Sequence, residues 1–215
     1  MLKKYRGLLI VTSFIILIPM LIGFGLWDQL PDQIPTHWNM QGEIDGYSSK
    51  LFAIVVLPLI LVGVQWLCTL GTLADPKNKN IADKLWKLVL WICPVISLLL
   101  GYITYGTVLG MQIDINAIMP IFMGLLFMVI GNYLPKCKQS YTVGIKIPWT
   151  LNSEENWNKT HRFAGPCWMI AGFLSAVLGM LGLMVPMLIC LIVMVFVPVV
   201  YSYMYYVKYE KDKEE

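Results

Sequence analysis

The sequence predicts an all-α integral membrane protein, built as a bundle of six transmembrane helices. Of its 215 residues, 58% are hydrophobic and only 13% are charged, whereas an ordinary soluble domain has about 25% charged residues. A chain this apolar cannot cover a water-facing surface with polar groups. Six apolar segments each approach the length of about 20 residues that a helix needs to cross a bilayer. We expect residues 1–215 to form a single membrane domain.

The six expected spans are separated by short connections, apart from two longer polar loops. Each span is expected to be helical because a helix satisfies its own backbone hydrogen bonds in lipid. The first is longer than the roughly 7–15 apolar residues of a signal peptide, so we expect it to be retained. In order, the spans are Leu8–Trp27, Leu51–Leu73, Leu85–Leu109, Ala117–Leu134, Gly165–Met184 and Pro186–Tyr206.

The distribution of basic residues predicts the orientation of the chain. Fifteen of the sixteen Lys and Arg residues fall near the N-terminus, the second connection, the fourth connection (residues 135–164) and the tail, which leaves only Lys50 on the other side. By the positive-inside rule, both termini are therefore cytoplasmic. Residues 28–50 become the extracytoplasmic loop between helices 1 and 2, and residues 207–215 become a charged cytoplasmic tail.

The polar loop after the first span predicts a short β-hairpin. Ile34–Trp38 and Glu43–Tyr47 are expected to pair around the turn "NMQG". We expect Gly42 and Gly46 to take positive φ, which glycine adopts without steric cost. Carboxylates outnumber bases in this loop, so its field attracts cations, either metal ions or basic peptides.

Two interpretations of His37 are open at this stage. One histidine and two carboxylates can form a facial metal-ligand set, and His37, Glu43 and Asp45 would supply it. Alternatively, His37 and Asp45 hydrogen-bond to each other and hold the loop. We favour the hydrogen bond because the other histidine, His161, is expected across the membrane and no HExxH spacing is present. We predict no bound metal and no cofactor.

The fourth connection predicts a short amphipathic helix on the membrane surface before the fifth span. Asn152, with Glu155 three positions later, is a capping-box-like start. The helix either anchors the fifth span or docks a cytoplasmic partner, and the pattern of residues favours anchoring. One face of it is formed at helical spacing by Trp157, Thr160, His161 and Ala164.

Both polar loops resemble segments of one protein family. The first loop, "LPDQIPTHWNMQGEIDGYSSK", resembles the LPxxIPxHxxxxGxxDGYxxK segment of SdpI-like membrane proteins. The fourth connection, "YTVGIKIPWTLNSEENWNKTHRFAG", resembles their GIRTPWTLxxxxxWxxTHRxxG segment. The motifs occur in the expected order within a six-helix chain, so the resemblance covers nearly the whole sequence. Lys146 and Ile147 stand where the family usually has Arg and Thr, and a lysine lacks the planar fork of arginine.

The resemblance implies a bacterial plasma-membrane protein that protects its host against a secreted killing peptide, an SDP-type toxin. It also implies a signalling role, in which the protein recruits a cytoplasmic repressor. The residues implied in toxin or ligand recognition by the first loop are His37, Asn39, Gly42, Asp45, Gly46 and Tyr47. Those implied in partner docking or in structure in the fourth connection are Lys146, Pro148, Trp149, Thr150, Trp157, Thr160, His161 and Arg162.

We therefore predict a binding protein rather than an enzyme. Its expected partners are membrane lipids, a secreted toxin peptide and a cytoplasmic repressor, with no direct contact to nucleic acid. The alternative is a metal-dependent membrane enzyme acting on an envelope substrate, in which His37 is a ligand or base and Glu43 and Asp45 are its partners. A transporter is disfavoured because the spans contain no Asp, Glu, Arg or His, and the one Lys within their bounds, Lys87, lies at the end of the third span; ion-coupled transporters usually carry ionisable residues deep within their spans.

Overall fold

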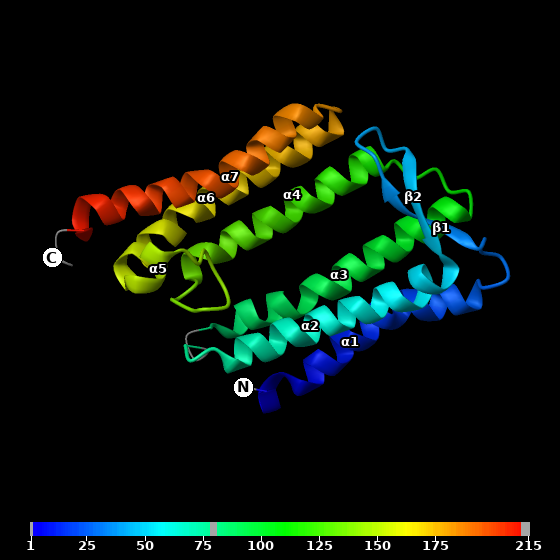
Figure 1. Ribbon diagram of the computed structural model, residues 1–215, viewed down its shortest axis with the longest axis horizontal. Helices are drawn as coiled ribbons and strands as arrows, with labels where there is room; N and C mark the ends of the chain where they lie inside the picture. The colour runs from blue at the N-terminus through cyan, green and yellow to red at the C-terminus, as the bar shows by residue number, and fades with distance from the viewer. Residues whose placement is uncertain (1, 78–80, 212–215) are drawn as a thin grey trace. The chain divides into compact units, whose positions relative to one another are not determined.

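The computed structural model describes residues 2–77 and 81–211, and it confirms the predicted helical membrane architecture (Figure 1). Within this described part of the chain, six helices are long and apolar enough to cross a membrane. The long helices are α1 (Leu2–Gly25), α2 (Leu57–Ala74), α3 (Asp83–Val108), α4 (Ile115–Tyr133), α6 (Glu154–Met180) and α7 (Met184–Tyr209). The cytoplasmic position of the two termini stays a prediction.

Shorter elements complete the fold. A two-stranded sheet, β1 (Gln33–Trp38) with β2 (Ile44–Ser49), follows α1. The π-helix η1 (Phe52–Val56) leads into α2, and the Leu57 amide bonds the Phe52 carbonyl five residues back. The 3₁₀-helix η3 (Leu134–Lys136) and the short helix α5 (Pro148–Asn152) lie between α4 and α6.

The amphipathic segment predicted as a separate surface helix is instead the first part of α6. The prediction was wrong about the break, because α6 runs without interruption from Glu154 into the fifth span. The start was also misplaced by one residue. Ser153 is the N-cap, with its hydroxyl accepting the Asn156 amide, whereas Asn152 ends α5. A serine at this position satisfies one of the amide groups that the first turn leaves unpaired.

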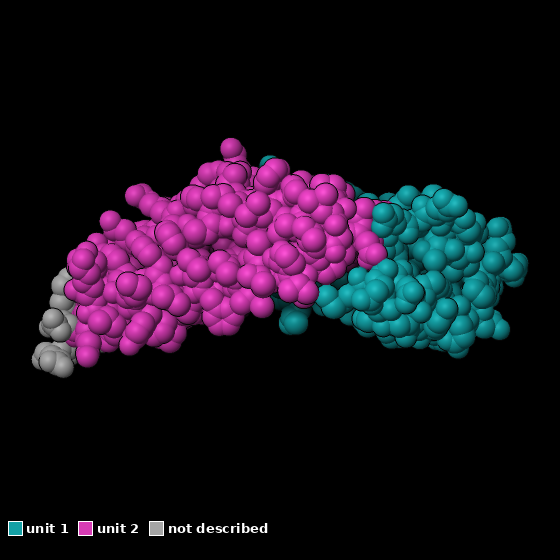
Figure 2. Space-filling view, turned by 90° about the horizontal axis from the view of Figure 1, so that it is seen from above, with its two compact units in different colours: residues 1–73, 86–115 teal, residues 74–85, 116–215 magenta. Residues whose placement is uncertain are grey.

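The chain forms two compact units, residues 1–73 with 86–115 and residues 74–85 with 116–215 (Figure 2). The first, unit 1, contains α1, the hairpin and α2, together with most of α3. The second, unit 2, contains α4, α5, α6 and α7. In unit 1 the hairpin lies at the end of the helices away from the N-terminus (Figure 1).

The polar contact between α2 and α3 in unit 1 arises because Pro94 leaves a backbone carbonyl without a donor and the buried side chain of Gln65 supplies one. Pro94 lies within α3 and has no amide hydrogen, so the carbonyl of Leu90 loses its usual helical donor. Gln65 of α2 supplies that donor through Nε2, 2.9 Å from the Leu90 oxygen. The same amide also bonds Thr12 and Ser13 of α1. Gln65 is 2% exposed, so this network joins three helices without leaving its own amide unsatisfied.

The turn of α1 around Pro19 packs against one face of α3. A Cβ on Gly101 would lie 2.7 Å from Cβ of Pro19, so only a glycine allows this approach. One turn to either side, Ser97 donates to the Ile16 carbonyl at 2.8 Å and Tyr105 donates to the Pro19 carbonyl at 2.8 Å. Side-chain hydroxyls thus supplement the backbone bonds around Pro19, as is common for proline in membrane helices.

Glycines at seven-residue spacing bring α4 and α6 together in unit 2. Gly124 and Gly131 of α4 face Gly172 and Gly165 of α6, and a Cβ on any of the four would meet backbone atoms of the other helix at 3.0 Å or less. Small residues allow close backbone approach where lipid removes the hydrophobic drive to associate. The seven-residue spacing keeps this seam on one face of each helix.

We predict that Gln65→Leu destabilises the protein by about 1–3 kcal/mol, because it leaves the Leu90 carbonyl buried without a donor. The measurement is the melting temperature of the purified protein in detergent. Gln112→Leu, at an exposed position of the α3–α4 loop, is the control and should melt like the parent. A Gln65→Leu protein as stable as the parent would show that the network is energetically neutral.

Candidate functional site

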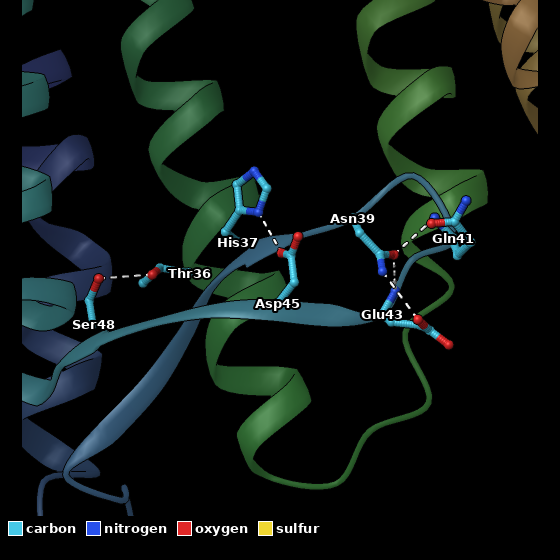
Figure 3. Close-up of polar contacts among 7 residues, drawn as sticks. All are labelled: Thr36, His37, Asn39, Gln41, Glu43, Asp45 and Ser48. Atoms are coloured by element: carbon cyan, nitrogen blue, oxygen red, sulfur yellow. Dashed lines mark hydrogen bonds and ion pairs between the residues drawn. The ribbon is translucent and has the colours of Figure 1, made fainter.

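The predicted hairpin is present, and its strands pair as expected. β1 and β2 are antiparallel, with Ile34 opposite Ser48 and Trp38 opposite Ile44, and the ladder is irregular around His37. The turn is closed by Asn39, whose Oδ1 accepts the amides of Gln41 and Glu43 at 2.9 Å each (Figure 3). Gly42 has φ +78°, which confirms the turn conformation predicted for it.

Gly46 corrects the prediction that it would take positive φ. It is absent from the residues with positive φ and lies in β2, directly opposite His37. A Cβ at this position would be 2.7 Å from Cβ of His37. Gly46 is thus required for the close cross-strand approach of His37, and the turn itself does not depend on it.

His37 and Asp45 form a hydrogen-bonded pair on the exposed surface of the hairpin. Nδ1 of His37 lies 2.5 Å from Oδ1 of Asp45, and their side chains are 72% and 43% exposed (Figure 3). This confirms the predicted contact. Glu43 instead accepts a bond from Nδ2 of Asn39 at 3.1 Å. Across the described residues, no group of three His, Cys, Asp or Glu side chains is arranged to hold a metal.

The hairpin is seated firmly on unit 1 through its other side. Ile34 is fully buried in an apolar cluster with Leu30, Ile54 and Tyr105. Lys50 follows β2 and donates to the Trp27 carbonyl at 3.1 Å, with Oδ1 of Asp32 3.6 Å away. The structure therefore holds the backbone while it leaves His37, Asp45 and Tyr47 exposed. The remaining predicted recognition residues, Asn39, Gly42 and Gly46, shape the hairpin.

The α4–α6 connection, residues 137–153, lies in unit 2 and is organised by Trp157 and His161 of α6. The two rings stack with centroids 4.1 Å apart, and both side chains are at most 1% exposed. Nε1 of Trp157 donates to the Cys137 carbonyl at 2.8 Å. The Ile145 amide donates to Nε2 of His161 at 2.9 Å. These bonds tie both halves of the connection to the first turns of α6.

The same contacts define the protonation state of His161. Because Nε2 accepts the Ile145 amide, the ring proton must be on Nδ1, which bonds the Trp157 carbonyl at 2.8 Å. The imidazole is thus neutral in this arrangement. Gly144 passes over the two rings with φ +124°, and a Cβ there would lie 2.6 Å from Nε2 of His161 and from the Trp157 ring. No other residue type fits this position without strain.

The residues predicted for docking or structure divide into two groups. The first group is buried and hydrogen-bonded within unit 2, as expected for a structural role rather than for docking of a partner. It consists of Thr150, Trp157, Thr160 and His161. The exposed residues are Lys146, Pro148 and Arg162, with Trp149 half-buried against Tyr203.

Asp75, which the sequence motifs do not include, is a central residue of unit 2. It is buried just after α2, and its carboxylate accepts the amides of Lys77 and Tyr141 and the hydroxyls of Ser140 and Thr142. Burial alone raises the pKa of Asp75, but these donors outweigh it and together hold the pKa below the ordinary value of 3.8. An Asp-Pro pair after an apolar helix was the only local signal for it.

Asn156 and Glu210 form a second group outside the predicted set. Asn156 is fully buried, and its amide bonds the Ser202 carbonyl and Glu210, each at 3.1 Å. Glu210 also accepts the Ser153 hydroxyl at 2.5 Å. The residue predicted as part of a charged tail therefore connects the end of α7 to the start of α6. Ser153, Asn156 and Thr160 lie at helical spacing on one face at the start of α6. A search for apolar residues at that spacing does not detect these polar ones.

Comparison with known proteins places both polar regions in described families. The SdpI/YfhL protein family matches residues 136–202, which include the α4–α6 connection, and a domain of unknown function, DUF1648, matches residues 14–62, which include the hairpin. Immunity protein SdpI of Bacillus subtilis (strain 168) is 26% identical over 207 residues, covering 93% of this chain and 96% of that protein. No solved structure matches. The family resemblance predicted from the two motifs is confirmed.

We predict that Gly144→Ala destabilises the protein by about 1–3 kcal/mol, the usual cost of forcing a side chain into a glycine-only conformation. Thermal unfolding in detergent would measure it. Gly71→Ala, at a helical glycine with open space around it, is the matched control and should not lower the melting temperature. Equal melting of both variants would contradict the role assigned to Gly144.

Asp75→Asn should also destabilise, by about 1–3 kcal/mol at pH 7, because several donors lose a charged acceptor. The pKa of Asp75 is lowered in the folded protein, so the ionised carboxylate stabilises the fold above pH 3.8, and this gain is lost as pH falls through the lowered pKa. Melting curves of parent and variant should converge as the pH is taken below 3.8. A difference that stays constant down to pH 3 would exclude this carboxylate as its source.

Proposed function

We propose that this chain, which resembles the SdpI-like family of multi-pass bacterial membrane proteins, is an immunity protein. It protects the cell that carries it against a secreted killing peptide of the SDP type. The name of the Bacillus subtilis relative and its alignment over most of both chains support this proposal. The observation that carries the choice of site is the exposed His37–Asp45 pair on a hairpin that is otherwise anchored to unit 1.

The hairpin suits recognition because its chemistry is separate from its anchoring. The buried contacts of Ile34 and the bonds of Lys50 fix its backbone, so little ordering entropy would be lost on binding. We place it outside the cytoplasm on the asymmetry of the basic residues. In that position its carboxylates favour the approach of cationic peptides from outside.

The signalling role is a second proposal and concerns the opposite side of the membrane. Of the residues in the α4–α6 connection, Lys146, Pro148 and Arg162 are exposed and can reach a cytoplasmic repressor. An enzymatic role finds less support, because His37 pairs with Asp45 while Glu43 bonds Asn39. We therefore infer a binding function for the hairpin.

We predict that His37→Ala and Asp45→Ala each abolish protection of a susceptible strain exposed to an SDP-type peptide. Loss of one charge-assisted hydrogen bond costs about 1.5–3 kcal/mol, or roughly ten- to a hundredfold in affinity. Membrane abundance should stay at the parent level because both side chains are exposed. Survival and immunoblotting of membranes are the two readouts.

Asp28→Ala is the matched control, since it removes an exposed carboxylate from the same connection and leaves both the pair and the contacts of Lys50 intact. It should protect as the parent does. If Asp28→Ala fails as badly as Asp45→Ala, net charge rather than the pair accounts for protection. If both pair variants protect fully, the hairpin pair is not the recognition site.

A further inference from the structure

A hollow of about 400 Å³ opens in unit 2 where α5, the start of α6 and the end of α7 meet. Its described lining contains two carboxylates and two aromatic rings, with no Lys or Arg among them. The lining residues are Pro148, Trp149, Asn152, Ser153, Glu155, Tyr206 and Glu210. Negative charge beside aromatic faces suits an organic cation.

The two carboxylates are held in position by neighbours. Tyr205 donates its hydroxyl to Oε1 of Glu155 at 2.6 Å. Glu210 accepts Ser153 on one oxygen and the fully buried Asn156 on the other. An ionised carboxylate has about four acceptor positions, so each group keeps acceptor capacity beyond these bonds. Both are therefore ordered acceptors at the wall of the hollow.

The aromatic wall adds a second attraction for positive charge. Trp149 packs against Tyr203 and Tyr206, with ring centroids 4.9 and 6.3 Å away. The faces of Trp and Tyr attract cations, and a guanidinium also stacks on them. Carboxylates beside aromatic faces favour a guanidinium or an ammonium group over a hydrated metal ion, which needs several oxygen ligands.

The two carboxylates of the hollow also indicate whether the cation comes from a lipid or from a protein. The amine of a lipid headgroup is attached to a phosphate, which would have to approach two carboxylates and be repelled. A Lys or Arg side chain brings no such anion, and its extended stem can cross the rim of the hollow. We propose that this hollow binds a basic side chain, preferably arginine, of another polypeptide. The site is separate from the hairpin and does not depend on toxin recognition.

The test uses the purified full-length protein in detergent and an acetylated, amidated tetra-arginine peptide, with binding measured by calorimetry. Glu155→Gln should weaken binding about fivefold, the upper range for one partly exposed ion pair. Trp149→Leu should weaken it about threefold or more by removing the ring face. Glu154→Gln is the matched control: it removes the neighbouring charge at the same helix start but does not line the hollow, and binding should change less than twofold.

The melting temperatures of the three variants separate effects on binding from effects on folding. The site is supported if Glu155→Gln melts at the same temperature as the parent but binds the peptide more weakly. The proposal fails if Glu154→Gln and Glu155→Gln weaken binding equally, because the peptide then senses only bulk charge. It also fails if parent and Glu155→Gln bind equally well. Short-chain phosphatidylethanolamine that displaces the peptide from the parent, and that itself binds Glu155→Gln more weakly than the parent, would assign the hollow to a lipid amine instead.

Discussion

A backbone amide or carbonyl that is buried away from water must find a partner. This requirement explains several of the polar side chains buried inside the protein. Pro94 leaves the Leu90 carbonyl without a helical donor, and Gln65 provides one. The α4–α6 connection has little regular structure, so the Ile145 amide and the Cys137 carbonyl bond side chains of α6 instead. Each of these side chains replaces a bond that a helix would otherwise have supplied.

This requirement gives the two polar regions different characters. In the α4–α6 connection the polar groups of Thr150, Trp157 and His161 are used within the fold, so substitutions there act first on stability. On the hairpin, Ile34 and Lys50 provide the anchoring, while the exposed side chains of His37 and Asp45 bond to each other. Substitutions of that pair can change recognition and leave the fold intact.

The spans and the hairpin could be predicted because their signals are local. Apolar length determines the helices, and Asn39 with Gly42 determines the turn. The conformation of Gly46 was predicted wrongly because glycines in turns were expected to have positive φ. Glycine is needed at this position because a Cβ would collide with His37 on the facing strand. Asp75 and Asn156 were missed for a related reason. Their partners Ser140 and Ser202 lie 65 and 46 residues away in the chain, so the weak local signals at Asp75 and Asn156 could not identify what these residues bind.

The continuity of α6 has a consequence for how the two ends of unit 2 are connected. A surface helix joined to the fifth span by a flexible break could move independently of it. Instead, one helix carries Trp157 and His161 at one end and the glycine seam with α4 further along. The buried Asn156 further couples the start of α6 to the end of α7 through Ser202 and Glu210. Any partner that binds beside Glu155 and Glu210 therefore contacts a rigid part of unit 2, and its binding energy is not spent on ordering a loose helix.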